Sequence, residues 1–401
     1  MVMAIIFSFS LNSIFLKKIN VLQKIRPFYF LFSLLLIFSC KSEAEKVAEK
    51  TAARNAVIDS TVQLFQQKLL KAQIDSVFST TQFNGSVSIR QNGKILYERE
   101  SGFEDFSTKT KLDSSSVFAI GSISKQFTAV LVLLQEEEGK LSTEDKVSKY
   151  LKEFQPKQFE NITIKELLNH TSGLSDFGNG LLSQPGAEFH YSNKGFHYLG
   201  KIIEKVSGKS YDENALKLFK RAGMTNSSTA KIFKGKHFAS AYIGNAQNFE
   251  RIENMPQRLA DILISVPAGG ILSTTNDLHR WNSALFTGKI LTAASLKKMT
   301  EKSAKRNHAI LGKMGYGLGI MMKVEKPVVY FHTGYVKGSP SLNMYYPKTK
   351  TSVVILSNIA NESKGKNAFF EPHKAVKKAA DPVEIAVVEL RQQMLNVQIP
   401  K

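Results

Sequence analysis

The sequence predicts an α/β (α+β) fold in which one mixed sheet is assembled from both ends of the chain around a helical middle. Residues 85–90 and 94–99 alternate apolar and polar side chains around Asn92-Gly93, which is a strong signal for a hairpin. Helical patterns follow at residues 122–138, 164–169, 195–206, 213–222 and 276–285. The last third returns to extended segments at residues 317–322, 328–332, 342–346 and 351–356, the final pair flanking a turn at 347–350.

The composition is that of a folded, strongly basic protein. The chain has 401 residues, 54 basic and 34 acidic side chains, and 43% hydrophobic residues, which is ample for a core. Its single cysteine excludes an internal disulfide framework and every zinc site that needs two thiolates. The histidines and carboxylates show no metal-site spacing, so we expect no metal and no cofactor. The basic residues are scattered, so we expect no nucleic acid partner. The net charge is +20, or +16 without the four basic residues of segment 1–40, and a charge of this size favours anionic surfaces such as lipid headgroups or cell-wall polymers.

Residues 1–40 have the pattern of a targeting segment. Residues 1–26 carry only positive charge, and residues 28–38 form a run of 11 residues that is apolar except for Ser33. This run is too short for a membrane-spanning helix of ~20 residues but suits a signal peptide. Cys40 follows almost directly, in a context that resembles a bacterial lipobox. The resemblance implies that Cys40 is lipidated and becomes the mature N-terminus. The alternative is an ordinary buried or signal-peptide cysteine.

The lipobox reading also implies a location. Residues 41–60 are polar and charged and are expected to form a tether, followed by an amphipathic helix at 62–78. The protein is then expected at the bacterial cell envelope, held to the membrane by a lipid anchor and facing the periplasm or the exterior. Lys41 stands where inner-membrane lipoproteins commonly have aspartate, which favours the outer membrane.

Ser122 and Lys125 are the first candidate catalytic residues. S-x-x-K occurs four times in this chain, but only at Ser122 does it follow an extended segment and a glycine and open a helix. Positions i and i+3 share one face of a helix, so Lys125 can reach the Ser122 oxygen. A serine becomes a nucleophile when a base takes its proton, and a lysine can serve when burial lowers its pKa. The alternative is an N-cap serine followed by a surface lysine.

Tyr191-Ser-Asn193 is the second candidate motif. It is the only Y-x-N among 12 tyrosines. Tyr191 can act as a phenolate-like base or a proton relay, and Asn193 as an amide that orients substrate and lysine. Taken alone, the tyrosine is more simply part of a helix cap.

His332-Thr333-Gly334 is the third motif, at the end of a predicted strand. Thr333 offers a hydroxyl, and Gly334 permits another chain to approach the strand backbone closely. The strand can bind an extended substrate, and the amide of Tyr335 can pair with the amide of Ser122 to hold an oxyanion. The alternative is a simple strand-end turn.

In this order, the three motifs resemble those of the serine β-lactamase and penicillin-binding protein family, S-x-x-K, Y-x-N or S-x-N, and K-T-G or H-T-G. The tyrosine makes the chain similar to the class C β-lactamases and their D,D-peptidase and esterase relatives, as do the stretches at 167–174, 267–278 and 315–319. The resemblance covers residues 72–375. It implies a β-lactamase/transpeptidase-like domain over 61–375, with an antiparallel sheet flanked by helices and an all-helical subdomain. Residues 376–401 remain as a helical or loose tail.

The resemblance also implies roles for the residues. Ser122 would form an acyl-enzyme, Lys125 and Tyr191 would share the proton transfers with the formal base left open, and Asn193 would orient. His332 stands where K-T-G enzymes have a lysine that grips a substrate carboxylate. Histidine is largely neutral at pH 7, which lowers the expectation of an efficient β-lactamase and favours a peptidase, amidase or esterase.

We therefore expect an envelope-anchored serine hydrolase that acts on an amide, ester or lactam in a small-molecule or peptide substrate, including those derived from peptidoglycan. The alternative is a catalytically silent relative that serves as a cell-wall-binding module. The presence of every motif side chain argues against that alternative. The loops at about 175–190 and 235–265 would shape the pocket, but their sequences do not indicate which substrate the protein binds.

Overall fold

The computed structural model describes residues 42–80, 83–245, 247–253, 255–260, 265–308 and 310–397. The chain divides into two compact units, residues 1–60 and 61–401. Helix α2 (Glu43–Thr80) covers most of the expected tether and the helix expected at 62–78. Cys40 and the expected signal peptide lie outside the described residues. Within the described ranges, no helix is both long and apolar enough to cross a membrane.

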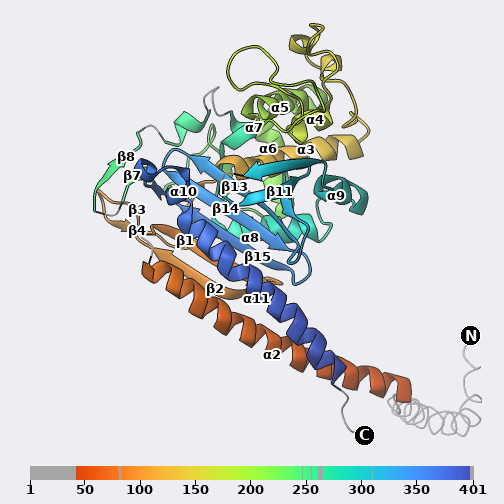
Figure 1. Ribbon diagram of the computed structural model, residues 1–401, viewed down its shortest axis with the longest axis vertical. Coiled ribbons are helices and arrows are strands. Elements are labelled where there is room, and N and C mark those ends of the chain that lie inside the picture. Colours follow the sequence, from red (N-terminus) through yellow and green to blue (C-terminus); the bar gives the residue numbers. More distant parts are fainter. Residues whose placement is uncertain are drawn as a thin grey trace, which may run out of the picture. The chain divides into compact units, whose positions relative to one another are not determined.

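An eight-stranded sheet forms the centre of the second unit, in the order β10-β11-β12-β13-β14-β15-β1-β2 (Figure 1). Strand β1 pairs with β15 from the other end of the chain, with Val87 opposite Ile355, which confirms a sheet built from both ends. Every pairing in this sheet is antiparallel, as the family resemblance implies, so the mixed sheet suggested by element order alone is corrected. The strands are β1 (Gly85–Gln91), β2 (Lys94–Ser101), β10 (Ala304–His308), β11 (Gly312–Tyr316), β12 (Met321–Lys323), β13 (Val329–Val336), β14 (Ser339–Tyr346) and β15 (Thr351–Ser357).

Both predicted hairpins are present. The β1–β2 hairpin turns at Asn92-Gly93, whose φ angles are 49° and 81°. A type I′ turn requires positive φ at both central residues, and asparagine followed by glycine tolerates this best. The turn at 347–350 joins β14 to β15.

Helices fill the middle of the chain, as predicted. The 3-10 turn η1 (Gly121–Ile123) leads into α3, and the short helix α7 (Val266–Gly269) packs against both. The apolar run of α3 is buried, and Phe127 stacks on Trp281 at 4.0 Å between ring centroids. Each such side chain contributes about 1.5–3 kcal/mol on burial, so the core holds the start of α3 firmly. The predicted helices are α3 (Ser124–Glu137), α4 (Ile164–Leu168), α5 (Asn193–Ser207), α6 (Tyr211–Ala222) and α8 (Thr275–Phe286).

Strands β10 and β11 were not predicted, and the strand expected at 317–322 begins only at Met321. Exposure alternates along β10, so positions 304, 306 and 308 turn inward. Two of these positions carry Arg306 and His308, so the apolar alternation that marks a strand is missing. Residues 317–320 form a turn instead, in which Gly319 has a φ of 68° and lies so close to α3 that a Cβ would be 2.6 Å from Ala129.

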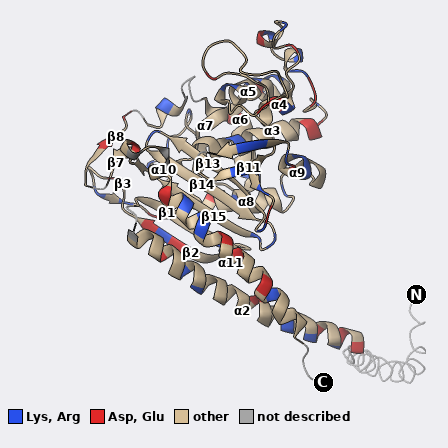
Figure 2. Ribbon diagram, viewed as in Figure 1, with Lys and Arg blue, Asp and Glu red and all other residues tan. Residues whose placement is uncertain are grey.

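The expected C-terminal tail is helical and belongs to the folded unit. Helix α11 (Glu371–Asn396) packs on β14, so the boundary expected at residue 375 falls inside a helix. Its buried side chains recur at helical spacing, at Val376, Ala380, Val383 and Val387. Lys and Arg residues are spread over many helices and strands rather than gathered on one element (Figure 2).

Candidate active site

The predicted nucleophile and base lie together at the start of α3. Ser122 belongs to η1 and Lys125 to the first turn of α3. The Lys125 amine is 3.1 Å from the Ser122 hydroxyl. The alternative of a capping serine and a surface lysine does not fit, because the N-cap of α3 is Ile123 and Lys125 is fully buried.

The buried amine has hydrogen-bond partners on three separate segments. Besides the contact with Ser122, Nζ donates to Asn193 Oδ1 at 2.8 Å and to the Ala268 carbonyl at 2.7 Å. Burial lowers the pKa of Lys125 well below its usual range, and Asp176 partly opposes this shift. The amine therefore gives up its proton far more readily than an exposed lysine does.

Tyr191 faces the same amine. Its ring centroid is 4.8 Å from Lys125 Nζ and 4.2 Å from the ring of His170. Burial raises the pKa of Tyr191 to about 12, although Arg306 and a hydrogen bond with Ser122 act in the other direction. Tyr191 is therefore a phenol at neutral pH, which makes it a proton donor rather than a ready base.

Asp176, which the sequence analysis did not single out, holds the second motif in place. One carboxylate oxygen accepts from the Ser192 hydroxyl (2.8 Å) and the Lys194 amide (3.0 Å), and the other accepts from the backbone amide (3.0 Å) and side-chain amide (3.2 Å) of Asn193. These bonds direct the Asn193 carbonyl oxygen at Lys125. The carboxylate also lies at the N-terminus of α5, where the helix dipole favours negative charge. No local pattern links Asp176 to a motif so far along the chain, so only the fold reveals this role.

The loop before the nucleophile lies directly against strand β13. A Cβ on Gly121 would be 2.7 Å from the Tyr335 amide nitrogen, and one on Gly334 would be 2.0 Å from the Ile120 carbonyl oxygen. Glycine at 334 thus permits a close approach by the nucleophile loop of the same chain. The Tyr335 amide lies beside the residue that precedes Ser122, which is the placement that an oxyanion hole needs.

The side chains of Thr333 and Tyr335 contact residues outside the nucleophile loop. The Tyr335 hydroxyl donates to Glu362 and its ring stacks on Phe369 at 4.3 Å, so only its backbone faces the nucleophile loop. Thr333 Oγ1 lies 3.2 Å from His308 Nε2.

His332, which the resemblance placed among the substrate-binding residues, lies in the interior of the protein. Its side chain is fully buried, and Nε2 is 3.0 Å from the Tyr316 hydroxyl, which is also 3.2 Å from His170 Nε2. Burial lowers the pKa of both histidines well below the usual range. Both are therefore neutral at pH 7, and His332 supports the site from behind.

The hydrogen-bond chain through Tyr316 has one consistent direction. His170 Nδ1 accepts from the Ser192 amide at 3.1 Å, so its Nε2 carries the proton and donates to Tyr316. Tyr316 then donates to His332 Nε2, and His332 Nδ1 donates to the Thr333 carbonyl at 2.6 Å. Buried neutral groups thereby join the second motif to the third.

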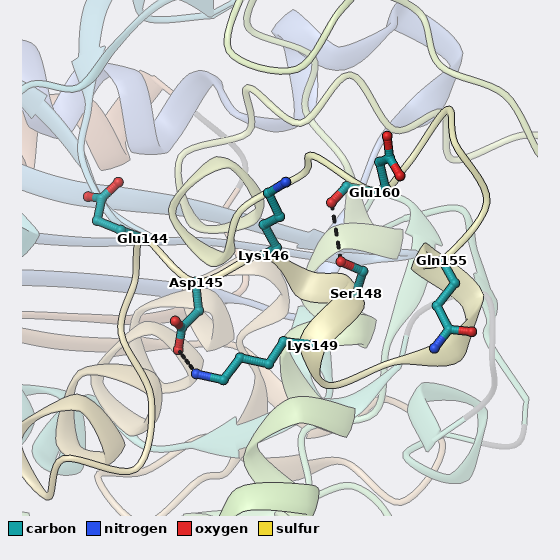
Figure 3. A pocket seen from close by; sticks show the side chains of 7 residues that line it. All are labelled: Glu144, Asp145, Lys146, Ser148, Lys149, Gln155 and Glu160. Atoms are coloured by element: carbon teal, nitrogen blue, oxygen red, sulfur yellow. Dashed lines mark hydrogen bonds and ion pairs between the residues drawn. The ribbon is translucent and has the colours of Figure 1, made fainter.

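Neither a metal cluster nor the charged surface hollow of Figure 3 adds to this site. Over the described part of the chain, no group of three His, Cys, Asp or Glu side chains could hold a metal ion. The hollow contains none of the motif residues, and its Lys149–Asp145 ion pair of 3.1 Å is of the solvated kind. It is lined by Glu144, Asp145, Lys146, Ser148, Lys149, Gln155 and Glu160.

The chain is similar to known proteins in sequence and in structure. The Beta-lactamase family model matches residues 67–372. A penicillin-binding protein of Bacillus subtilis strain 168 is 27% identical over 371 residues, which is 80% of each chain. The octameric penicillin-binding protein homologue from Pyrococcus abyssi is similar in structure, with a TM-score of 0.63 at 26% identity over 75% of each chain. The D-amino acid amidase from Ochrobactrum anthropi has a TM-score of 0.67 at 20% identity, over 80% of this chain and 99% of that one.

The family match covers most of the chain, and the chain therefore belongs to the Beta-lactamase family, whose members are in general serine hydrolases. The structural neighbours confirm the predicted fold. The low identity of the amidase limits that comparison to the fold.

Removal of the Tyr316 hydroxyl is expected to destabilise the protein, because it leaves the His170 and His332 Nε2 atoms without partners in the interior. Tyr316→Phe should lower the free energy of unfolding by about 1–3 kcal/mol, measured by urea denaturation. Tyr345→Phe is the matched control. Tyr345 is also buried, and its hydroxyl has no hydrogen-bond partner among the described residues. Equal losses of unfolding free energy in the two variants would show that the hydrogen bonds of Tyr316 add no stability to the protein.

Proposed function

We propose that this protein is an active serine hydrolase of the class C type, which forms an acyl-enzyme on Ser122 and cleaves an amide, ester or lactam. The observation that carries the proposal is the placement of the Lys125 amine, which lies 3.1 Å from Ser122 with the carbonyl oxygens of Asn193 and Ala268 beside it. A neutral amine has two N–H groups and one lone pair. The two carbonyl oxygens take the N–H groups, so the lone pair is left to accept the Ser122 proton.

In acylation, Lys125 takes the hydroxyl proton while Ser122 Oγ bonds to the substrate carbonyl carbon. The carbonyl oxygen becomes an oxyanion, which the amides of Ser122 and Tyr335 stabilise. Tyr191, a phenol at neutral pH, donates its proton to the departing nitrogen or oxygen and regains one from protonated Lys125.

In deacylation, a water molecule replaces the leaving group. Its proton passes through Tyr191 to Lys125 while its oxygen bonds to the acyl carbon. The second oxyanion collapses, the Ser122 oxygen leaves, and Lys125 returns the proton to it. Asn193, held by Asp176, orients Lys125 throughout.

The proposed location is the bacterial cell envelope, with the lipid anchor at Cys40 and the outer membrane favoured. The apolar run before Cys40 supports it, as does the net charge, which is +20 for the whole chain and +16 without the four basic residues before Cys40. The family acts on small-molecule or peptidoglycan-derived substrates, and we propose the same class here.

A fluorophosphonate probe should label the wild-type protein on Ser122, because the probe reacts with an activated serine. Ser122→Ala should lose the label, whereas Ser363→Ala, which alters an exposed serine of another S-x-x-K, should keep it. The same variants, tested with a p-nitrophenyl ester, a chromogenic cephalosporin and a D-Ala-D-Ala peptide, identify the bond that is cleaved. A folded wild-type protein that shows neither label nor turnover would favour the silent cell-wall-binding module instead.

Asp176→Asn should move the acid limb of the kcat/KM profile to lower pH. The Asp176 charge raises the pKa of Lys125, so its removal makes the ammonium form less stable and lets the base lose its proton at lower pH. The plateau should fall about tenfold, because Asn193 loses part of its anchor. Asp75→Asn, which alters a carboxylate paired with Lys71 on α2, should leave the profile in place. An upward shift in Asp176→Asn would contradict this account.

Radiolabelled palmitate should be incorporated into the wild-type protein in cells and not into Cys40→Ala, because the chain contains no second thiol. The variant should also move from the membrane to the soluble fraction. A Cys40→Ala protein that retains the label would refute the anchor.

A further inference from the structure

A hollow of about 410 Å³ lies apart from the candidate active site and contains none of the three motifs. It is lined by residues of α6, α8, β1, β14 and β15, and by residues of the turns at 92–93 and 347–350. A hydrogen bond of 3.4 Å from the Asn92 amide to the Lys350 carbonyl joins these two turns. The volume of the hollow is within the range of small-molecule binding sites.

The charged side chains that line this hollow are all cations. No carboxylate among the described residues lines it, whereas three line the hollow of Figure 3 and two line the hollow between α2 and β2. The whole chain has 54 basic and 34 acidic side chains, so a wall of six cations without a carboxylate departs from its average composition. The six are Arg90, Lys220, Arg221, Arg280, Lys289 and Lys350.

Half of these cations have no partner for their charge. Arg280 pairs with Asp277 at 2.8 Å, and Arg90 Nη2 pairs with Glu98 at 3.2 Å. Even so, Arg90 Nε is buried and has no hydrogen-bond partner among the described residues. The exposed ammonium groups that form neither an ion pair nor a hydrogen bond with a described residue are those of Lys220, Lys289 and Lys350.

Local structure accounts for only part of this charge. Helices α6 and α8 both end at the hollow, and each C-terminus carries about half a negative charge, which favours Lys220 and Arg221 in the last turn of α6. Lys289 and Lys350 lie outside the helices. Lys350 has a φ of 57°, where glycine or asparagine is usual, so the turn itself does not call for a lysine. His279 also lines the hollow but adds no charge, because burial lowers its pKa to about 3.

We propose that this hollow is a second binding site, which takes the phosphomonoester group of a sugar phosphate or of a lipid headgroup. A phosphomonoester carries nearly two negative charges and three strong acceptor oxygens. It can therefore accept hydrogen bonds from several lysines and arginines at once, and it would relieve the repulsion among them. A carboxylate has one charge and two oxygens, so it matches this wall less well. The proposal does not depend on the hydrolase activity, because the hollow shares no residue with the catalytic motifs.

The competing explanation is a solvated basic surface that attracts every anion in proportion to the net charge of the protein. On that explanation, lysines removed from the hollow and lysines removed from elsewhere weaken anion binding equally. It also predicts no preference between anions beyond their charge. The position of the lysines and the chemistry of the anion therefore separate the two explanations.

Two triple variants with equal charge provide the test. The hollow variant is Lys220→Gln/Lys289→Gln/Lys350→Gln. The surface variant, Lys111→Gln/Lys157→Gln/Lys234→Gln, removes three exposed lysines that do not line the hollow. Urea denaturation should show that both variants are folded, because the exchanged side chains are exposed in each.

Isothermal titration with glucose 6-phosphate at low ionic strength, where screening is weak, should show binding to the wild type. The hollow variant should bind about tenfold more weakly or not at all, since a tenfold loss is the size of one charge-assisted hydrogen bond. The surface variant should keep the wild-type affinity. Glucuronate, which carries a carboxylate on the same kind of sugar ring, should bind the wild type about tenfold more weakly than glucose 6-phosphate.

Vesicles distinguish the source of the phosphate. In the Cys40→Ala background, which lacks the proposed anchor, binding to phosphatidylcholine vesicles with and without phosphatidic acid gives a ratio for each variant. If the site takes a lipid headgroup, phosphatidic acid should raise binding of the wild-type hollow and of the surface variant but not of the hollow variant. If the site takes a soluble phosphate ester, only the titration with glucose 6-phosphate should separate the two variants.

The proposal is overturned if neither phosphomonoester probe separates the hollow variant from the surface variant. Equal weakening in both variants would show a solvated basic surface, and equal affinity for glucuronate and glucose 6-phosphate would refute a phosphate site. None of these measurements requires turnover. A protein that binds phosphate in the hollow but shows no fluorophosphonate labelling would refute the hydrolase alone, and a labelled protein without phosphate binding would refute this site alone.

Discussion

The burial of the Lys125 amine is the constraint on which the rest of this structure depends. A charged amine without partners in the interior would cost several kcal/mol. The fold offsets that cost with three oxygen atoms from three segments, on Ser122, Asn193 and Ala268. Each segment has its own anchor. Asn193 is fixed by Asp176, the turn that carries Ala268 packs so closely on α5 that a Cβ on Gly200 would meet Pro267 at 2.3 Å, and η1 lies on β13. The site therefore exists only when the helical middle and the sheet have folded together.

The neutral chain from His170 through Tyr316 to His332 serves the same requirement. It connects the loop before α5 to strand β13 with hydrogen bonds whose donors and acceptors are all matched. Charged histidines here would be repelled by the Arg306 guanidinium and by Lys125 whenever its amine is protonated, and both groups act on the pKa of both rings. Burial keeps the rings neutral, so the chain holds the two motifs together without adding to the positive charge of the site.

Features of the fold that depend on local sequence could be predicted, and those that depend on distant contacts could not. The Asn92-Gly93 hairpin and helix α3 follow from turn chemistry and apolar spacing within a few residues. The meeting of Ser122, Lys125 and Tyr191 was implied by the order of three motifs, which no single motif establishes. Asp176 lies in a loop without periodicity, and strand β10 turns Arg306 and His308 inward in place of apolar residues. Likewise, the sequence of the third motif does not indicate whether His332 faces Tyr316 or the substrate.

Burial shifts the pKa values of the two proton-transfer groups, Lys125 and Tyr191, in opposite directions. Burial lowers the pKa of Lys125 and raises that of Tyr191, because in each case it disfavours the charged form. The result is a neutral amine beside a neutral phenol, which is the pair that acylation needs: one group to accept the proton of Ser122 and one to give a proton to the leaving group.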